Sequence, residues 1–174
     1  MTTNHSFWTH GNALVVESPE NLSSPGNYGW GADVDIKPGK SSWFHIPLSS
    51  PQMLNSNSVR LLRAYLFFDA FNCSIRNVHL YDGSINVHNY DNLFLENDHR
   101  QKKDTLNTFI LPHEHTVKTG IGISFFCIAS IGFDSQIPTP RLIISSAGAD
   151  YVTGIDIKFE DHISSKAATG IFKG

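Results

Sequence analysis

"VRLLRAYLFFDAF", residues 59–71, is the longest apolar run of the chain and decides its fold class. The run contains four aromatic residues, Tyr65, Phe67, Phe68 and Phe71. Aromatic side chains favour a strand over a helix here, because they fit the pleated and half-buried surface of a sheet. Apolar residues occupy both parities of the run, so both faces of the strand should be covered. The pattern predicts a central β-strand.

Shorter segments around this run alternate between apolar and polar residues, as strands with one buried face do. They lie at 33–36, 43–46, 105–111 and 155–159. About ten short strands separated by turns are typical of a sandwich or a barrel. The long loops between the strands favour a jelly roll. We therefore predict an all-β fold, a two-sheet antiparallel β-sandwich of jelly-roll type.

The length and composition suit one globular domain. The chain has 174 residues, of which 40% are hydrophobic, and a chain of this size can bury a sizeable core. The residues after Asp161 are polar and rich in alanine and glycine, so few of them would be held by a core. We predict a single β-sandwich domain over residues 1–160 and a loosely held tail over residues 161–174.

The charge pattern excludes a nucleic-acid partner. Charged residues make up only 17% of the chain and the formal net charge is -3. The densest basic stretch, residues 99–103, is flanked by Asp98 and Asp104, which cancel much of its charge. A nucleic-acid-binding protein would instead carry a basic face.

The sequence also bears on location and redox state. The first residues lack the basic and apolar regions of a signal peptide, and no apolar run is long enough to span a membrane. A cytoplasmic location is the default, and export by a route without a cleaved signal stays open. Cys73 and Cys127 lie in apolar strand-like runs, which favours buried free thiols, although a disulfide between them stays open.

A hairpin is predicted at "NVHLYDGSINVH", residues 77–88, because Asp82-Gly83 is a strong signal for a two-residue type I′ loop. That loop would pair Tyr81 with Ser84. The register that follows pairs Leu80 with Ile85, His79 with Asn86, Val78 with Val87 and Asn77 with His88. It would bury the four apolar residues Val78, Leu80, Ile85 and Val87 and leave Asn77, His79, Asn86 and His88 on the opposite face.

This polar face is the first candidate ligand-binding site. Imidazole, amide and phenol groups supply hydrogen-bond donors, acceptors and stacking surface in one patch. In the predicted register His79 and His88 lie diagonally, about 7–8 Å apart. Two histidines are fewer than the three or four ligands that zinc needs, so no metal is predicted here. The alternative is an ordinary polar sheet face. The candidate residues are Asn77, His79, Tyr81, Asn86, His88 and Tyr90.

A second histidine pair, His113 and His115 in "LPHEHTV", resembles the start of the ligand set of metal-binding cupins. The cupin pattern continues with a glutamate a few residues later, and no carboxylate follows here. Glu114 would point to the other side, and Pro112 favours a loop. We predict a solvated loop without metal. Asp33 and Asp35 likewise offer too few oxygen ligands for calcium.

The loop "SSPGNYGWG", residues 23–31, places Tyr28 and Trp30 between glycines. Exposed aromatic rings can cover the apolar face of a sugar while neighbouring amides and imidazoles bind its hydroxyls. The alternative is that Trp30 closes one end of the sandwich, since tryptophan is usually well buried. Tyr28 and Trp30 are therefore the second candidate ligand-binding site.

Four stretches, "HGNALVVESPENL", "GWGADVDIKPGKSSWFHIPL", "IRNVHLYDG" and "HTVKTGIGISFFCIASIGFD", together span most of residues 10–134. They resemble a family of small, mainly bacterial and fungal proteins of uncharacterised function. The resemblance implies a single compact domain. It brings no assigned activity and no catalytic residues.

Taken together, these features favour a non-catalytic binding module for a glycan or a small polar ligand, without a cofactor. One alternative is a structural protein that assembles as a homo-oligomer through its sheet faces and tail. Another is a cupin-like enzyme with an interior pocket lined by histidines. The sequence leaves these alternatives open and favours a protein that is not an enzyme.

Overall fold

The computed structural model describes residues 2–131 and 138–154, and these residues form an all-β, antiparallel fold, as predicted. Helical structure in this part of the chain is confined to two three-residue 3-10 turns, Gly11–Ala13 and Pro19–Asn21. The strands are β1 (Thr3–His10), β2 (Val15–Val16), β3 (Leu22–Tyr28), β4 (Gly31–Ile36), β5 (Ser41–Pro47), β6 (Met53–Leu54), β7 (Asn57–Ser58), β8 (Arg60–Asp82), β9 (Ile85–Tyr90), β10 (Leu95–Asp98), β11 (Thr108–Thr116), β12 (Ile121–Ala129) and β13 (Arg141–Thr153).

Within the described residues, hydrogen bonding joins eleven strands into one curled sheet, and β6 and β7 form a separate ribbon. The main order is β2-β5-β12-β8-β13-β4-β3, with β1 added to β13 and with β9, β10 and β11 added to β8. The two predicted sheets are therefore continuous, because β8 is shared between them. The jelly-roll connectivity remains a prediction.

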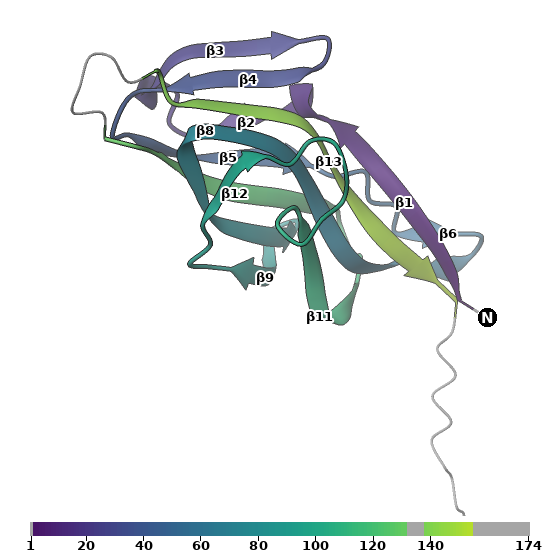
Figure 1. Cartoon of the computed structure of the whole chain (residues 1–174). Helices are drawn as coiled ribbons and strands as arrows, with labels where there is room; N and C mark the ends of the chain where they lie inside the picture. Colours follow the sequence, from purple (N-terminus) through teal and green to yellow (C-terminus); the bar gives the residue numbers. More distant parts are fainter. Residues whose placement is uncertain (1, 132–137, 155–174) are drawn as a thin grey trace, which may run out of the picture.

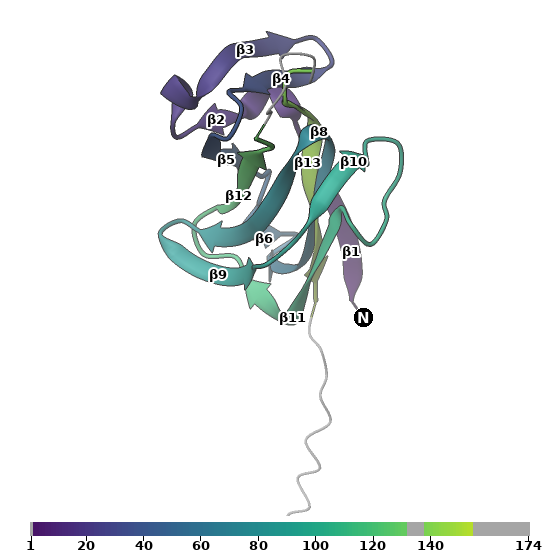
Figure 2. The same cartoon turned by 60° about the vertical axis from the view of Figure 1, so that its left-hand side comes forward.

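Strand β8 explains this continuity, and it runs through the middle of the molecule in Figures 1 and 2. It is 23 residues long, so the predicted central strand and the first hairpin strand are a single element. Its first half, up to Phe71, pairs with β13, and its second half, from Cys73, pairs with β12. Asn72 lies between them with a φ of 52°. This left-handed residue marks the point where β8 passes from one half of the sheet to the other.

The core lies inside the curl and is built by strict alternation along the strands. In β5 and β12, Phe44, Ile46, Ile123 and Phe125 point inward and are buried. Phe44 and Phe125 stack with ring centroids 5.4 Å apart. In the first half of β8 one face is buried, while the other is mostly half-buried and ends at the exposed Phe71, so the predicted covering of both faces is only partly met.

Cys73 and Cys127 are free thiols, and both are buried. Burial raises the pKa of Cys127 well above its ordinary value, so this thiol stays protonated.

No histidine in residues 2–131 and 138–154 is fully buried.

The predicted hairpin register is wrong: the turn lies one residue later, and the strand partners are shifted by two residues at Tyr81 and by three from Leu80 to Val78. The observed pairs are Asp82 with Ile85, Tyr81 with Asn86, Leu80 with His88, His79 with Asn89 and Val78 with Tyr90. The turn is therefore centred on Gly83 and Ser84, and Val87 is an extra residue in an irregularity of the ladder. Val78 and Leu80 are buried as predicted, whereas Ile85 is 49% exposed.

The reason for the shift is that Asp82 belongs to the strand and not to the turn. Its carboxylate is buried and accepts hydrogen bonds from the backbone amides of Lys118, Thr119 and Gly120. A turn residue would instead be exposed to solvent.

Among the described residues, no helix has the length and apolar character that crossing a membrane requires. Residues 155–174 lie outside the described part, and so do the alternating segment at 155–159 and the predicted tail at 161–174. The boundary at residue 160 stays a prediction.

Candidate functional site

Two surfaces carry the residues that the sequence singled out, and they lie on different parts of the sheet. The first is the outer face of β5, β12 and β8, which we call the His79 face. It comprises Trp43 and His45 of β5, Ser124 and Phe126 of β12, and Asn77, His79 and Tyr81 of β8. The second is a cleft beside the turn between β3 and β4.

On the His79 face, aromatic and polar side chains alternate across the strands. The Trp43 ring lies between His79 and Phe126, with centroid distances of 4.9 and 5.4 Å. Asp91 accepts hydrogen bonds from His79 Nε2 at 2.8 Å and from Asn77 Nδ2 at 2.5 Å. These two bonds lower the pKa of the Asp91 carboxyl. The result is a fixed polar cluster next to an indole.

A second row on this face places Ser124, His45 and Glu17 in the order of a hydrolase triad. His45 Nδ1 lies 2.8 Å from Ser124 Oγ, and His45 Nε2 lies 3.2 Å from Glu17 Oε2. A triad carboxylate is buried, where it orients the imidazole. The Glu17 side chain is instead 59% exposed, so this row is better described as a hydrogen-bonded polar surface.

The structure separates the histidines of the predicted patch. His88 pairs with Leu80 and Tyr90 pairs with Val78, so both face the side opposite to His79. Tyr90 packs against Phe109 at 5.3 Å, and burial raises the pKa of Tyr90 to about 12.

Asn86 lies opposite Tyr81 and donates a hydrogen bond to Asn89. Asn77, His79, Tyr81 and Asn86 therefore stay together on one face, and His88 and Tyr90 leave it.

The second histidine pair also differs from its prediction. His113 and His115 belong to strand β11 and not to a loop. His115 Nε2 lies 2.9 Å from the buried carboxylate of Asp82, whereas His113 is exposed. In residues 2–131 and 138–154, no three His, Cys, Asp or Glu side chains converge as they would around a metal ion.

Tyr28 and Trp30 do not close the end of the sandwich. Both are exposed, by 50% and 47%, and their rings stack in parallel with centroids 5.2 Å apart and an angle of 2°. They lie at the turn between β3 and β4, at the end of the molecule away from β9 and β11 (Figures 1 and 2). The alternative reading, in which Trp30 is a buried plug, is wrong.

Tyr28 also lines a cleft with a volume of about 430 Å³, which we call the Tyr28 cleft. Its walls come from β3, β4, β8, the first residue of β13 and the segment just before β13, namely Ser24, Tyr28, Asp33, Asp35, Phe71, Pro138, Thr139 and Arg141. Phe71 is 50% exposed, although it belongs to the apolar run that forms the central strand. The cleft thus combines two exposed aromatic rings with charged groups.

An ion pair fixes the polar side of the Tyr28 cleft. The Arg141 guanidinium donates from both Nε and Nη2 to the carboxylate of Asp33, with an Nε to Oδ1 distance of 2.7 Å. This pairing raises the pKa of Arg141, and Asp35 adds to the effect. A bidentate pair holds both planar groups in one orientation. The cleft therefore presents preset donors and acceptors.

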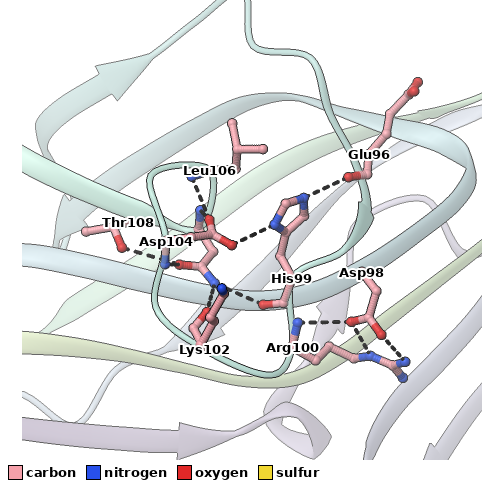
Figure 3. Close-up of polar contacts among 9 residues, drawn as sticks. Glu96, Asp98, His99, Arg100, Lys102, Asp104, Leu106 and Thr108 are labelled. Carbon is pink, nitrogen blue, oxygen red and sulfur yellow. Dashed lines mark hydrogen bonds and ion pairs between the residues drawn. The ribbon is translucent and has the colours of Figure 1, made fainter.

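A third polar cluster holds the connection between β10 and β11 in one conformation, as Figure 3 shows. The buried Asn107 side chain donates to the carbonyls of His99 and Lys102 at 2.9 and 2.8 Å, and it accepts from the amide of Asp104 at 2.8 Å. His99 bridges Asp104 and the carbonyl of Glu96. These donors and acceptors are already paired with one another, so the cluster stabilises the loop and leaves few polar groups for a ligand.

Sequence reasoning missed several members of these sites. Phe71 and Arg141 join the Tyr28 cleft because β13 pairs with both β8 and β4. Asp91 joins the His79 face from beyond the end of β9. Such long-range pairings leave no local signal in the sequence. The alternating pair Asp33 and Asp35 could be recognised in the sequence, but the cleft that these residues line could not.

Comparison with known proteins gives a family and distant likenesses to solved structures, including the following two. No curated protein matches the chain. A solved structure of the carbohydrate-binding module CBM36 in complex with calcium and xylotriose has a TM-score of 0.35 and 10% identity, covering 80% of this chain and 96% of that chain. The secreted serine protease VesC from Vibrio cholerae has a TM-score of 0.33 and 15% identity, covering 73% of this chain and 24% of that chain.

TM-scores this low carry no conclusion about ligand or activity. The sequence match is more extensive, since it spans residues 2–161. The chain belongs to DUF6623, a family of unknown function.

Proposed function

We propose that this protein is a non-catalytic binding module and that the Tyr28 cleft binds a glycan. The observation that carries the proposal is the exposure of three aromatic rings, those of Tyr28, Trp30 and Phe71, at and beside one cleft. Exposed aromatic side chains are costly to solvate, and a cluster of them at a cleft is typical of a binding surface. Ring faces match the apolar faces of sugars, so the same residues supply both affinity and orientation.

The polar groups of the cleft suit a ligand rich in hydroxyls. Asp33 and Asp35 provide carboxylate acceptors, Arg141 provides donors, and Ser24 provides a hydroxyl that can do both. The bidentate pair of Asp33 and Arg141 keeps these groups in place before a ligand arrives. A volume of about 430 Å³ lies within the range of small-ligand pockets.

A glycan array probed with the full-length protein tests this proposal, followed by calorimetric titration of the best glycan. Tyr28→Ala and Trp30→Ala should each weaken binding at least about tenfold, since stacking on an aromatic ring contributes on the order of 1–3 kcal/mol by analogy with stacked bases. Asp35→Asn should weaken binding less, because the amide keeps one acceptor oxygen.

The matched controls lie on the His79 face. Trp43→Ala and His79→Ala remove an aromatic ring and an imidazole from the other candidate surface, so they should leave glycan affinity unchanged. If they abolish binding while Tyr28→Ala does not, the ligand belongs to the His79 face and the site assignment is wrong. If no glycan on a broad array binds, the functional proposal itself fails.

A further inference from the structure

The backbone of strand β3 holds the Tyr28 ring in one place. A Cβ atom on Gly26 would lie 2.7 Å from Cε2 of Tyr28 and 3.0 Å from the carbonyl oxygen of Asp33, so the ring occupies space that only a glycine leaves open. The ring also stacks in parallel on Trp30. Tyr28 is therefore fixed within the cleft that Asp33 and Asp35 line from the neighbouring strand β4.

The charged groups of the Tyr28 cleft do not cancel. Among the described residues that line it, Arg141 is the only cation, whereas Asp33 and Asp35 are both anions. Asp33 accepts from both Nε and Nη2 of Arg141. The Asp35 carboxylate forms no ion pair with any described residue, and Lys37, two residues later, donates to the carbonyl of Glu20. Asp35 therefore leaves the cleft with an excess negative charge.

The neighbouring part of the sheet does not supply the missing cation. Asp69 of β8 pairs with Arg100, and Arg100 also binds Asp98. Asp35 and Asp69 both help to raise the pKa of Arg141, so three carboxylates, with that of Asp33, lie near one guanidinium group. An acidic group on a ligand would add to this excess of negative charge, whereas a cation would reduce it.

A protonated amine suits both parts of the cleft. A cation is attracted to the face of an aromatic ring, and Tyr28 and Phe71 are each exposed by 50%. The hydrogen bond from an ammonium group to a carboxylate is also stronger than that from a hydroxyl group. A carboxylate on the ligand would instead be repelled by Asp35 and would find both of these Arg141 donors occupied.

We propose, building on the glycan-binding function proposed above, that the glycan of the Tyr28 cleft carries unacetylated amino groups, as glucosamine oligomers do, and that Asp35 accepts from the ammonium group. Neutral sugars and sugar acids bind more weakly. Asp35 is then the residue that selects among glycans, whereas Tyr28 binds the sugar ring whatever its substituent.

Calorimetric titration of the full-length protein at about pH 6 with three β-1,4-linked trisaccharides tests this inference. Chitotriose carries an amine on each ring where cellotriose carries a hydroxyl, and the trimer of glucuronic acid carries carboxylates instead. Chitotriose should bind about fivefold more tightly than cellotriose, as expected for one partly exposed ion pair. The glucuronic acid trimer should bind most weakly, because like charges repel.

Two carboxylate variants locate the preference. Asp35→Asn should lower the affinity for chitotriose about fivefold and leave that for cellotriose within about twofold, so the preference disappears. Asp91→Asn, which removes an exposed carboxylate from the His79 face, is the matched control and should keep the preference. Tyr28→Ala should weaken both trisaccharides, because stacking does not require the amine.

The outcomes separate this inference from the proposal that the cleft binds a glycan. If cellotriose binds as tightly as chitotriose and Tyr28→Ala weakens both, the cleft binds glycans without selecting amines, and the inference is wrong. It is also wrong if Asp35→Asn leaves the preference for chitotriose unchanged, or if the strongest ligands on the glycan array are neutral or acidic. Absence of binding to every glycan overturns both proposals. Melting temperatures of the variants separate loss of the site from loss of folding.

Discussion

Asp82 joins the end of β8 to residues 115–120, a stretch more than thirty residues away in the sequence. Its carboxylate accepts hydrogen bonds from His115 of β11, from the Thr119 hydroxyl and from three successive backbone amides before β12. Burial alone would raise the pKa of Asp82, but these hydrogen bonds outweigh burial and hold the pKa well below its ordinary value. The ionised carboxylate is therefore a structural part of the fold.

Asp82→Asn should lower the free energy of unfolding at pH 7 by about 2–4 kcal/mol, because the amide leaves several charge-assisted bonds weakened or unmade. Urea unfolding of both proteins measures this difference. Asp91→Asn is the control, since the Asp91 side chain is 46% exposed, and it should leave the urea midpoint close to that of the native protein. A cost as small as that of the control would show that the Asp82 cluster does not hold the segments together.

The same carboxylate predicts a pH dependence. A folded-state pKa below the unfolded value means that the contribution of Asp82 is fully present above the unfolded value near 3.8. The contribution is then lost as the pH falls through the lower, folded-state pKa. The stability difference between the native protein and Asp82→Asn should therefore shrink as the pH is lowered from 7 to about 3. A difference that stays constant over this range would contradict the assignment.

Asp82 also shows what a local sequence signal omits at this scale. Asp-Gly was interpreted as a turn because the pair is common in type I′ loops. The structure uses only Gly83 in the turn, with a φ of 59°, and keeps Asp82 in the strand. Asp82 stays in the strand because its carboxylate accepts hydrogen bonds from the amides of residues 118–120, more than thirty residues away. The turn propensity of a dipeptide contains no information about a partner so far away in the sequence.

At the scale of elements, the central position of β8 followed from its sequence, while its length did not. Apolar residues at both parities of residues 59–71 predicted a central strand. The apolar run ends at Phe71 and the predicted hairpin began at Asn77, yet β8 is continuous and Asn72 marks only the change of partner from β13 to β12. Strand pairing up to Phe71 and again from Cys73 keeps β8 continuous across the left-handed residue Asn72.

Asn72 should tolerate glycine but not alanine. Its φ of 52° lies in the left-handed region, and its side chain donates to the carbonyl of Pro138 at 2.9 Å. Asn72→Ala should lower the free energy of unfolding by about 1–2 kcal/mol, because it adds backbone strain and removes that bond. Asn72→Gly loses the bond without the strain, so chemical denaturation should show a smaller loss. Equal losses would mean that the backbone conformation at this position is unimportant.

The connection between β10 and β11 depends on one buried side chain, that of Asn107. Asn107→Ala would leave the carbonyls of His99 and Lys102 and the amide of Asp104 without their partner. Amide hydrogen exchange across residues 99–107 should rise by a factor of ten or more, since each unmet buried group costs about 1–3 kcal/mol. Gln101→Ala, an exposed change in the same loop, is the control and should leave exchange unaltered.

At the scale of the whole molecule, fold class and sites differ in how far the sequence predicts them. The all-β class follows from local alternation, which each strand carries in its own residues. The Tyr28 cleft needs Tyr28, Phe71 and Arg141 to meet, and this depends on the register of β13 against two other strands. Aromatic residues were recognised as candidates because of their type. The residues that lie beside them in the cleft could be identified only once the pairing of β13 with β4 and β8 was known.

The continuity of the curled sheet predicts that it unfolds as one unit, and two neighbouring residues of β12 can test this. Phe125 is fully buried against Phe44 inside the curl, whereas Phe126 contacts Trp43 on the His79 face. Phe125→Ala should cost about 3–5 kcal/mol, as expected for emptying a core site. Phe126→Ala should cost about 1 kcal/mol, because its side chain is only half buried.

For both variants, the unfolding transitions followed by circular dichroism and by tryptophan fluorescence should coincide. Trp8 and Trp43 report on β1 and β5, which lie on opposite sides of β8 in the strand order. If Phe125→Ala separated the two transitions, the halves of the sheet would be independent folding units. The shared strand β8 would then join them without coupling their stabilities.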